Sequence, residues 1–407
     1  MGSWGWKLPG DESPELVLTE RKSHDNVLGR HARLFHNHSS GALMLHLAKQ
    51  SFAVVDGKKV SDSTTIWSDL THITFGALSY QLQLDGANDS AHRGRLTRYQ
   101  KIHGLTVNDY PVNLLSTPAK SDYIHKDYVI KNAIGHGSSS TVFAGEHIKS
   151  GNAVAIKRMT RTRQNAGPIE REIQMTAFLG RHHSLCHLID GMSPNGDRRG
   201  QYFRNGAFDE VYLIYSPLVT TTWFPLCEPG PTSDAYYTIC TKIFWQCLEG
   251  IDYIHSKGVM HRDIRPGNLA VVSWNPPQCR VINFGSAQMG INSNDVNVGT
   301  TPYCAPEMWR LSRSGKTSGL GYNEKVDMFA VGVSAYQIFC KQPLWWGHEA
   351  DEYVLDVMKA DLKSQGGAPL DVQDLIRSLL ADDAELRPCA KDARKSLDNW
   401  HGPENQG

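Results

Sequence analysis

The segment His261-Arg-Asp-Ile-Arg-Pro-Gly-Asn268 decides how this sequence of 407 residues is interpreted. It follows residues 234–255, where apolar side chains recur at the spacing of an amphipathic helix. Thr232, Ser233 and Asp234 are available to cap the start of that helix. Asn283-Phe-Gly285 comes twenty residues after Asp263, and Gly299-Thr-Thr-Pro-Tyr-Cys-Ala-Pro-Glu307 follows it. The fixed order of these polar and glycine-containing motifs indicates that this part of the chain carries the chemistry.

Two further motifs stand upstream, in a part of the chain that is rich in strand-like runs. In Ile134-Gly-His-Gly-Ser-Ser-Ser-Thr-Val142, two glycines would let backbone amides approach a phosphate closely. This signal is weak by itself, because Ser140 stands where such loops usually have a third glycine. Val154-Ala-Ile-Lys157 then ends an apolar strand with a lysine, which needs a counter-charge to be tolerated there. A predicted helix offers Glu172 or, as the alternative, Glu170.

Taken together, the five motifs resemble those of the eukaryotic protein kinases over about residues 126–400. The resemblance implies an α+β, bilobal protein-kinase fold, in which a β-rich lobe precedes an α-rich lobe. Residues 327–340 are nearly all apolar, which predicts a buried helix. Lys325-Val-Asp327, at its start, resembles the helical segment whose aspartate holds the catalytic-loop backbone in these kinases. Leu386-Arg-Pro388 resembles their C-terminal arginine motif, which implies an ion pair between Arg387 and Glu307.

The same resemblance implies roles in transfer of the ATP γ-phosphate, a reaction that needs positioning and charge neutralisation. Asp263 would accept the proton of the substrate hydroxyl, and Arg265 would stand near the γ-phosphate, where Ser/Thr kinases usually carry lysine. Thr300, with a proline two residues later, resembles the substrate-docking loop of the Ser/Thr class. The implied cofactors are ATP and Mg²⁺. The implied catalytic residues are Asp263, Lys157, Arg265 and Asn268. The implied nucleotide-binding residues are Gly135, Gly137, Val142, Ala155, Lys157, Glu172, Tyr215, Ser216 and Leu218, and the implied metal ligands are Asn268 and Asn283.

Asn283 is the main departure from the family pattern, which has aspartate at this position. Magnesium prefers carboxylate oxygens, so an amide is expected to weaken metal binding and to impair turnover. Three functions stay open: a Ser/Thr protein kinase with impaired turnover, a pseudokinase scaffold that regulates a partner protein, and a phosphopeptide-binding adaptor. A protein substrate or a regulatory protein is the expected partner in the first two.

The resemblance also defines a short activation segment between Asn283 and Glu307. Asp295 is expected to substitute for a phosphate opposite Arg262 in this segment. The hydroxyl groups that could accept a phosphate are Ser286, Ser293, Thr300 and Thr301.

Residues 16–84 have the alternation and turns of a small all-β sandwich, and Asp56-Gly57 predicts a hairpin between residues 52–55 and 58–60. Arg30-His-Ala-Arg-Leu-Phe35, Val55-Asp-Gly-Lys-Lys-Val60 and the strand pattern at 72–80 resemble the second half of a forkhead-associated (FHA) domain. Leu28 falls where that family binds phosphate through serine, and Ser51-Phe52 replaces its Asn-Gly turn, so phosphothreonine peptides are not expected as ligands. An FHA-like domain before a Ser/Thr kinase resembles the checkpoint-type and meiotic kinases, particularly the fungal ones.

The remaining segments are expected to be connections: residues 1–15 a tail, 85–125 a linker and 401–407 a second tail. With 42 basic and 42 acidic residues, the chain is not expected to bind nucleic acid. No apolar run is long enough to span a membrane, and the N-terminus lacks a signal-peptide pattern. Eight scattered cysteines favour reduced thiols in a cytoplasmic or nuclear protein over disulfides or a zinc site.

Overall fold

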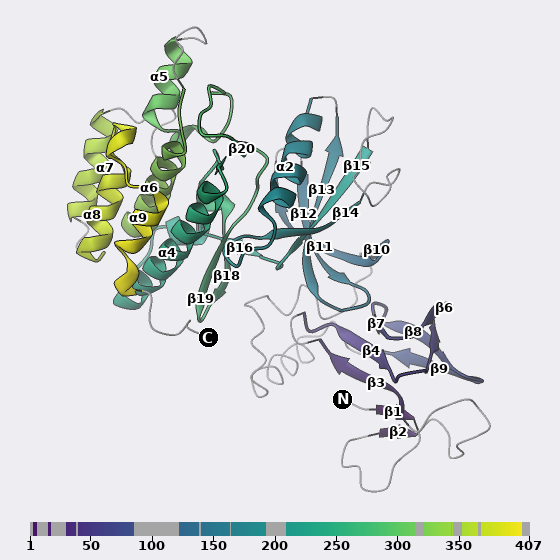
Figure 1. Cartoon of the computed structure of the whole chain (residues 1–407). Helices are drawn as coiled ribbons and strands as arrows, with labels where there is room; N and C mark the ends of the chain where they lie inside the picture. The colour runs from purple at the N-terminus through teal and green to yellow at the C-terminus, as the bar shows by residue number, and fades with distance from the viewer. Residues whose placement is uncertain are drawn as a thin grey trace. The chain divides into compact units, whose positions relative to one another are not determined.

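The structure is a computed structural model of the whole chain, and it forms two compact units, which we describe separately. Unit 1 comprises residues 1–160, 191–193 and 210–218, and unit 2 comprises residues 161–190, 194–209 and 219–407. The structure describes residues 3–5, 15–17, 30–37, 40–84, 122–137, 140–162, 164–192, 209–314, 321–342, 344, 352–364 and 368–400. The fold is α+β, as expected, with strands in unit 1 and mainly helices in unit 2 (Figure 1).

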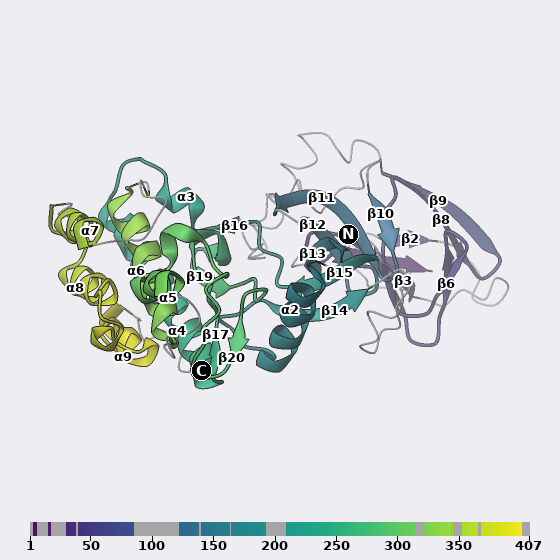
Figure 2. The ribbon, with the colours of Figure 1, turned by 90° about the horizontal axis from the view of Figure 1, so that it is seen from above.

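The N-terminal part of unit 1 is the expected β sandwich, and Figure 2 shows β8 and β9 in one layer and β2 and β3 in the other. The first sheet has the order β2-β1-β3-β4-β7, formed by Ser3–Gly5 (β1), Glu15–Val17 (β2), Arg30–His36 (β3), Leu43–Leu47 (β4) and Ser63–Thr65 (β7). The second has the order β6-β5-β8-β9, formed by Ala53–Val55 (β5), Lys58–Val60 (β6), Leu70–Phe75 (β8) and Leu78–Gln83 (β9). The buried core between them comprises Ala32, Leu45, Leu47, Ala53, Val55, Ile66, Ile73 and Phe75.

Two details relate this sandwich to the sequence. The Asp56-Gly57 dipeptide forms the predicted hairpin between β5 and β6, and both residues have positive φ, 46° and 79°, as a tight hairpin turn requires. The segment expected to be a tail contains β1, whose Ser3 pairs with Arg33 of β3. Backbone pairing with an available sheet edge orders a segment too short to show a strand pattern of its own.

A six-stranded sheet has the order β10-β11-β12-β13-β15-β14, and unit 1 contains most of its strands, whereas most of β14 is assigned to unit 2. Its strands are Tyr123–His125 (β10), Tyr128–His136 (β11), Ser140–His147 (β12), Ala153–Arg161 (β13), His187–Met192 (β14) and Asp209–Ser216 (β15). The end of the expected linker is therefore a strand, because β10 pairs with β11, while residues 85–121 lie outside the described part of the chain.

The sandwich contacts the turn that joins β12 to β13. Ser40 Oγ donates a 2.5 Å hydrogen bond to the Gly151 carbonyl, and Thr65 N donates a 2.7 Å hydrogen bond to the Ile148 carbonyl. Gly151 has φ 67°, and a Cβ there would lie 2.3 Å from the sulfur of Met44, so this contact requires glycine. The two β structures of unit 1 are therefore packed together at this turn.

Unit 2 is built around two long helices, Asp234–Ser256 (α4) and Lys325–Cys340 (α6), which run side by side in Figure 1. Ser233 caps α4 by accepting a hydrogen bond from Tyr236 N, as the sequence suggested. Every residue of α6 after Lys325 is buried, which confirms the predicted apolar helix. The other helices are Ala166–Leu179 (α2), Phe224–Cys227 (α3), Pro306–Ser314 (α5), Glu352–Ser364 (α7), Leu370–Leu379 (α8) and Ala390–Lys395 (α9). The 3-10 helices are Pro266–Asn268 (η2), Thr301–Tyr303 (η3), Ala384–Leu386 (η4) and Asp398–Trp400 (η5).

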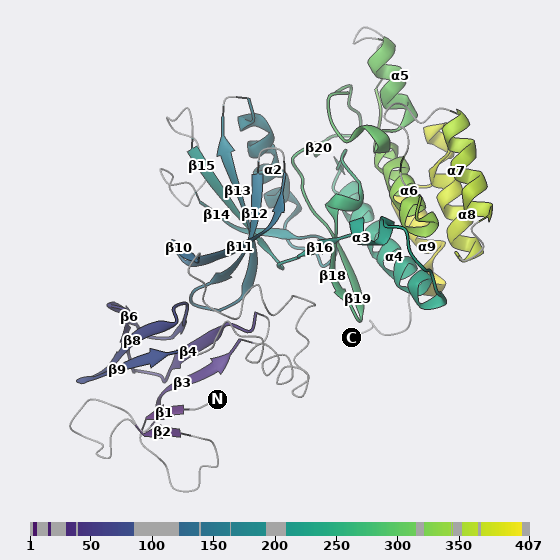
Figure 3. The same cartoon turned by 180° about the vertical axis from the view of Figure 1, so that it is seen from behind.

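Two small sheets of unit 2 flank the loops that contain residues 261–268 and 282–287. One has the order β16-β18-β19, from Thr221–Thr222 (β16), Leu269–Trp274 (β18) and Pro277–Val281 (β19), and Figure 3 shows β18 and β19 beside α4. The other pairs Val259–Met260 (β17) with Gln288–Met289 (β20). None of the described helices is both long and apolar enough to cross a membrane.

Candidate active site

The loop between β17 and η2 is fixed in place by the carboxylate of Asp327 on α6. Asp327 Oδ2 accepts from His261 N at 2.7 Å, and Oδ1 accepts from Arg262 N at 2.7 Å. His255 Nε2 lies 2.9 Å from Oδ2. Burial raises the pKa of Asp327, but the hydrogen bonds from His255 and His261 outweigh burial and hold it below its ordinary value. The aspartate therefore stays charged and holds the loop backbone, as the resemblance implied.

Asp263 occupies the centre of this loop and its carboxylate is held by two side chains. Asn268 Nδ2 donates to Asp263 Oδ2 at 2.8 Å, and also to the Asp263 carbonyl at 2.7 Å. Thr300 Oγ1 donates to Asp263 Oδ1 at 2.7 Å. Arg265 Nε lies 3.8 Å from the same Oδ1. The structure thus brings together three of the four residues expected to be catalytic, with Thr300 added to them.

Asn283 lies next to Asn268 and has a left-handed backbone, with φ 67°. Its Nδ2 donates to Asn268 Oδ1 at 3.1 Å. A half-turn of the Asn283 amide would bring the two amide oxygens face to face. Hard oxygen donors suit magnesium, so Asn268 and Asn283 fit this ion chemically, although neither carries charge. No described group of three or more His, Cys, Asp and Glu side chains could hold a metal ion.

The residues expected to bind nucleotide form a row across unit 1. Gly135 on β11 pairs with Val142 on β12, and Val142 pairs with Lys157 on β13. Ala155 lies two residues before Lys157 and therefore faces the same side of the sheet. Gly137 N donates to the Ser140 carbonyl at 2.8 Å and closes the loop between β11 and β12. The glycine motif and the lysine, far apart in sequence, are thus placed side by side.

The other expected nucleotide residues belong to β15, its continuation and α2. Tyr215 and Ser216 end β15, and Leu218 is fully buried in an apolar cluster against which Ala155 packs. In unit 2, the Glu172 side chain on α2 is buried. A Cβ placed on Gly285 would lie 3.6 Å from Glu172 Oε2 and 3.7 Å from Asn283 Oδ1, so these two side chains both lie next to Gly285.

Comparison with known proteins decides the family. The protein kinase domain family matches residues 128–397, about two thirds of the chain. The chain belongs to the protein kinases. Its kinase domain is similar to a probable serine/threonine-protein kinase 2 of Plasmodium falciparum, with 28% identity over 55% of this chain and 40% of that protein. It is also similar to the rat interferon-induced, double-stranded RNA-activated protein kinase, with 26% identity over 69% of this chain and 53% of that protein. Mitogen-activated protein kinase 13 of Pan troglodytes is 27% identical over 58% of this chain and 60% of that protein. The chain therefore spans 40 to 60% of the length of these relatives.

The activation segment of this kinase domain is fastened by the buried guanidinium of Arg262. Its Nη1 donates to Gln288 Oε1 at 2.6 Å, and to Ser293 Oγ and Tyr322 OH, both at 3.1 Å. Asp295 Oδ2 lies 3.7 Å from Nη1, so the expected acidic neighbour of Arg262 is present. Ser293, one of the expected phosphate acceptors, is itself buried in this network.

A second brace of the kinase domain is the expected pair of Arg387 and Glu307. Arg387 Nη1 and Nη2 donate to the two carboxylate oxygens of Glu307 at 2.7 and 2.8 Å. Arg387 is completely buried and also donates to the Ala381 carbonyl at 2.8 Å. The bidentate geometry suits arginine and fixes the start of α5.

Sequence reasoning missed several participants in these networks. His255 contacts Asp327 from α4, and Tyr322 contacts Arg262 from the segment before α6. Gln288 also reaches Arg262, from β20. These contacts join residues 26 to 72 positions apart, so local sequence carried no signal for them.

Proposed function

We propose that this protein is an ATP-dependent Ser/Thr protein kinase with slow turnover. The observation that carries the proposal is the arrangement around Asp263. Its carboxylate is oriented by Asn268 and Thr300, and Arg265 places a positive charge 3.8 Å away. A fixed carboxylate beside a cation suits a group that accepts a hydroxyl proton while phosphate charge is neutralised nearby.

In this mechanism each residue has a limited task. Asp263 accepts the proton of the substrate Ser or Thr hydroxyl and aims its oxygen at the γ-phosphate. Lys157 and the amides of the Gly135–Gly137 loop bind the nucleotide phosphates, and Arg265 faces the transferred group. Magnesium bound at Asn268 and Asn283 would neutralise phosphate charge.

The slow turnover follows from Asn283. An amide in place of a carboxylate removes one negative charge from the metal ligands, and magnesium binds carboxylates more strongly. Losing a few kcal/mol of transition-state stabilisation lowers the rate by about 10²–10³-fold. The hydrogen bond from Asn283 Nδ2 to Asn268 Oδ1 supports this view, because it engages the oxygen that would bind the ion.

The test is transfer of radiolabelled phosphate from ATP to a Ser/Thr protein substrate by the purified full chain. Lys157→Met and Asp263→Asn should abolish transfer. Asn283→Asp should raise kcat by at least about tenfold, equivalent to about 1.4 kcal/mol of barrier. An inactive parent with an equally inactive Asn283→Asp variant would contradict the proposal.

The pseudokinase alternative is favoured by the same bond between Asn283 and Asn268, since it lets the two amides satisfy each other. Under that alternative, ATP would stabilise the protein equally with and without Mg²⁺, and no variant would restore transfer. Thermal melting with ATP, in the presence and absence of Mg²⁺, separates the two functions. A shift that grows with Mg²⁺, together with measurable transfer, supports the enzyme.

For residues 16–84 we propose a degenerate FHA-type domain that acts as a packing or docking module. Support comes from its two-sheet architecture and from the contacts of Ser40 and Thr65 with the turn between β12 and β13. Leu28 lies outside the described residues, whereas His31 is buried, with Nε2 2.9 Å from the Phe52 carbonyl. Titration of the full chain with phosphothreonine peptides should show no binding that disappears on dephosphorylation.

A further inference from the structure

Arg265 is the cation beside Asp263, yet the contacts of its guanidinium are few. Its Nε is buried and has no hydrogen-bond partner among the described residues. Its nearest acidic atom is Asp263 Oδ1, 3.8 Å from Nε, beyond hydrogen-bond distance. A guanidinium that is neither bonded nor paired closely needs packing on its planar faces or edges to keep one orientation.

Gly267 and Phe224 lie close to this guanidinium. A Cβ at Gly267 would lie 2.7 Å from Arg265 Nη1 and 3.3 Å from its Cζ. The same Cβ would lie 2.7 Å from Phe224 Cε2. The guanidinium and the aromatic ring therefore both occupy the space that any side chain at position 267 would need.

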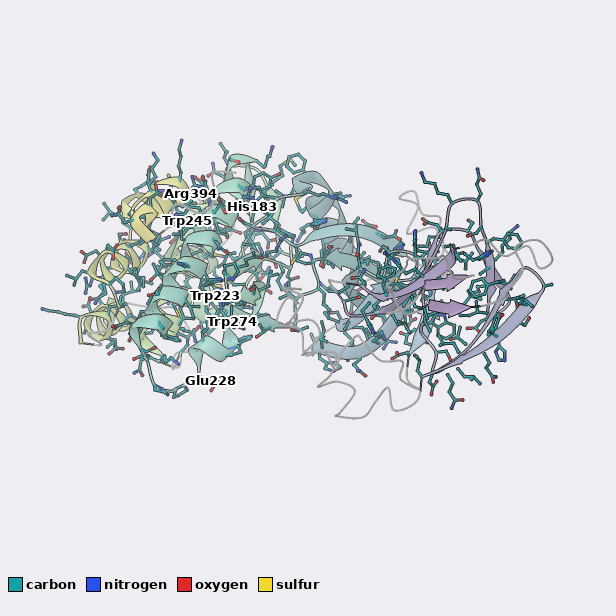
Figure 4. The ribbon with its side chains drawn as sticks, turned by 90° about the horizontal axis from the view of Figure 1, so that it is seen from below. His183, Trp223, Glu228, Trp245, Trp274 and Arg394 are labelled. Carbon is teal, nitrogen blue, oxygen red and sulfur yellow. The ribbon has the colours of Figure 1, made fainter. Side chains whose placement is uncertain are left out.

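Phe224 is held in place although its side chain is 48% exposed. Thr222, two residues earlier, pairs with Ala270 where β16 joins β18. Trp223 is completely buried, and its backbone N–H donates to the carbonyls of Pro266 at 3.1 Å and Leu269 at 2.9 Å. Figure 3 shows α3 beside β16, and Figure 4 places Trp223 within the drawn part of unit 2, with Glu228 at its edge. The chain thus fixes the first residue of α3 against the catalytic loop at both ends of η2.

We propose that Phe224 and Gly267 are positioning residues that hold the Arg265 guanidinium toward the γ-phosphate of bound ATP. This inference rests on the proposed kinase function and deepens it. Phe224 Cε2 and Arg265 Nη1 each lie 2.7 Å from the position that a Cβ at Gly267 would take, so the ring and the guanidinium are neighbours across this glycine. Arginine is planar and longer than the lysine usual in Ser/Thr kinases, and the gap left by glycine accommodates the extra bulk.

The first experiment measures binding and needs no turnover. Affinities for ATP and ADP are determined by calorimetry for the parent, Arg265→Ala, Phe224→Ala and Gly267→Ala. Because ADP lacks the γ-phosphate, loss of the Arg265 contact should lower the ATP-to-ADP affinity ratio by about fivefold. Phe224→Ala and Gly267→Ala should reproduce that fall while leaving ADP affinity unchanged. Phe52→Ala, which removes a comparably exposed phenylalanine (42%) of the N-terminal sandwich, should change neither affinity.

The second experiment tests whether Phe224 acts through Arg265. In the Arg265→Ala background, adding Phe224→Ala should leave the ATP-to-ADP ratio where Arg265→Ala alone put it. An additive fall, or an unchanged ratio in Phe224→Ala with the parent-like melting temperature retained, would overturn the inference. A parent that binds neither nucleotide would overturn the proposed function and this inference with it. A parent in which Arg265→Ala alone alters the ratio would leave the kinase function standing and refute the positioning role.

Discussion

Asp327 in unit 2 and Glu146 in unit 1 are equally buried, each with 1% of its surface exposed. The surroundings of Asp327 favour its charged form, whereas those of Glu146 favour its neutral form. Asp327 accepts hydrogen bonds from two backbone amides, with His255 as a third partner, and its pKa is lowered. Glu146 Oε1 has no hydrogen-bond partner among the described residues, and Lys131 Nζ lies 3.8 Å away. Burial raises the pKa of Glu146 to about 7, against the attraction of Lys131 and with the repulsion of Asp122.

The difference shows that burial alone does not determine whether a carboxylate is charged or protonated. Hydrogen-bond donors to both oxygens stabilise the charged carboxylate enough to offset its desolvation. One ammonium group shared by two carboxylates does not. In unit 2 the charge is used to fix a loop. In unit 1 the buried glutamate keeps a proton over part of the physiological pH range.

The largest effect is expected for Asp327→Asn. The amide would present a donor to a backbone N–H that now donates to a carboxylate oxygen, so a buried donor would be left without an acceptor. The free energy of unfolding of unit 2 should fall by about 3–5 kcal/mol in urea titrations followed by tryptophan fluorescence. Asp374→Asn removes an exposed partner of Arg377 and should cost less than about 0.5 kcal/mol. Equal losses in the two variants would contradict the assigned role of Asp327.

The next prediction concerns the pH dependence set by Glu146. Its pKa in the folded state lies above the ordinary value of 4.5, so folding binds a proton between these two values. The stabilisation from this group is complete below pH 4.5 and is lost as the pH rises toward about 7, by about 3 kcal/mol in total. Glu146→Gln should remove this slope from the unfolding free energy of unit 1, measured by denaturant titration at several pH values. Glu170→Gln, at a half-exposed glutamate 3.8 Å from Arg161, should leave the slope intact.

The contribution of Asp327 to stability changes with pH in the opposite direction from that of Glu146. Its lowered pKa means that its contribution is present above the ordinary value of 3.8 and is lost as the pH falls through the folded-state value. Acid should therefore weaken the anchoring of the loop that contains Asp263 in unit 2, whereas it should stabilise the surroundings of Glu146 in unit 1. Parallel pH profiles of the two units would refute the contrast.

A smaller effect is expected for Glu307→Gln. This change removes the charge partner of the buried Arg387, but the Ala381 carbonyl still accepts from the guanidinium. Unit 2 should lose about 2 kcal/mol of unfolding free energy, less than for Asp327→Asn. Asp382→Asn is the matched control, since it removes an exposed partner of Arg310 close by, and it should cost less than about 0.5 kcal/mol.

The smallest effect is expected for Ser40→Ala, which removes a neutral hydrogen bond from the sandwich to the Gly151 carbonyl. The loss should be about 1 kcal/mol in the unfolding of unit 1, because no charge is left buried without a partner. Differential scanning calorimetry of the full chain measures it. Ser68→Ala, whose hydroxyl accepts from Leu70 N within the sandwich, is the control and should leave the contact with the turn unchanged. A loss as large as that of Asp327→Asn would show that the turn contact, and not the charged network, dominates stability.

The sequence predicted the local structure well where a motif had a local cause. The apolar run of α6, the cap at Ser233 and the hairpin at Asp56-Gly57 each follow from neighbouring residues, and each is present. The expected pairs of Arg387 with Glu307 and of Asp327 with the loop backbone are also present. The strand β1 was not predicted, because its order depends on the edge of β3 rather than on its own residues.

The sequence alone determined, through motifs that resemble those of the protein kinases, that this chain belongs to that family and has a neutral amide at position 283. Only the tertiary structure decided which of two equally buried carboxylates keeps its charge, because the donors around each come from distant segments. It also decided that Phe224 and Arg265 both lie next to Gly267, where the pairing of β16 with β18 places the segment that contains Phe224. Electrostatic interactions and packing depend on distances between atoms in space. The separation of two residues along the chain does not determine those distances, because they are set only when the whole chain has folded.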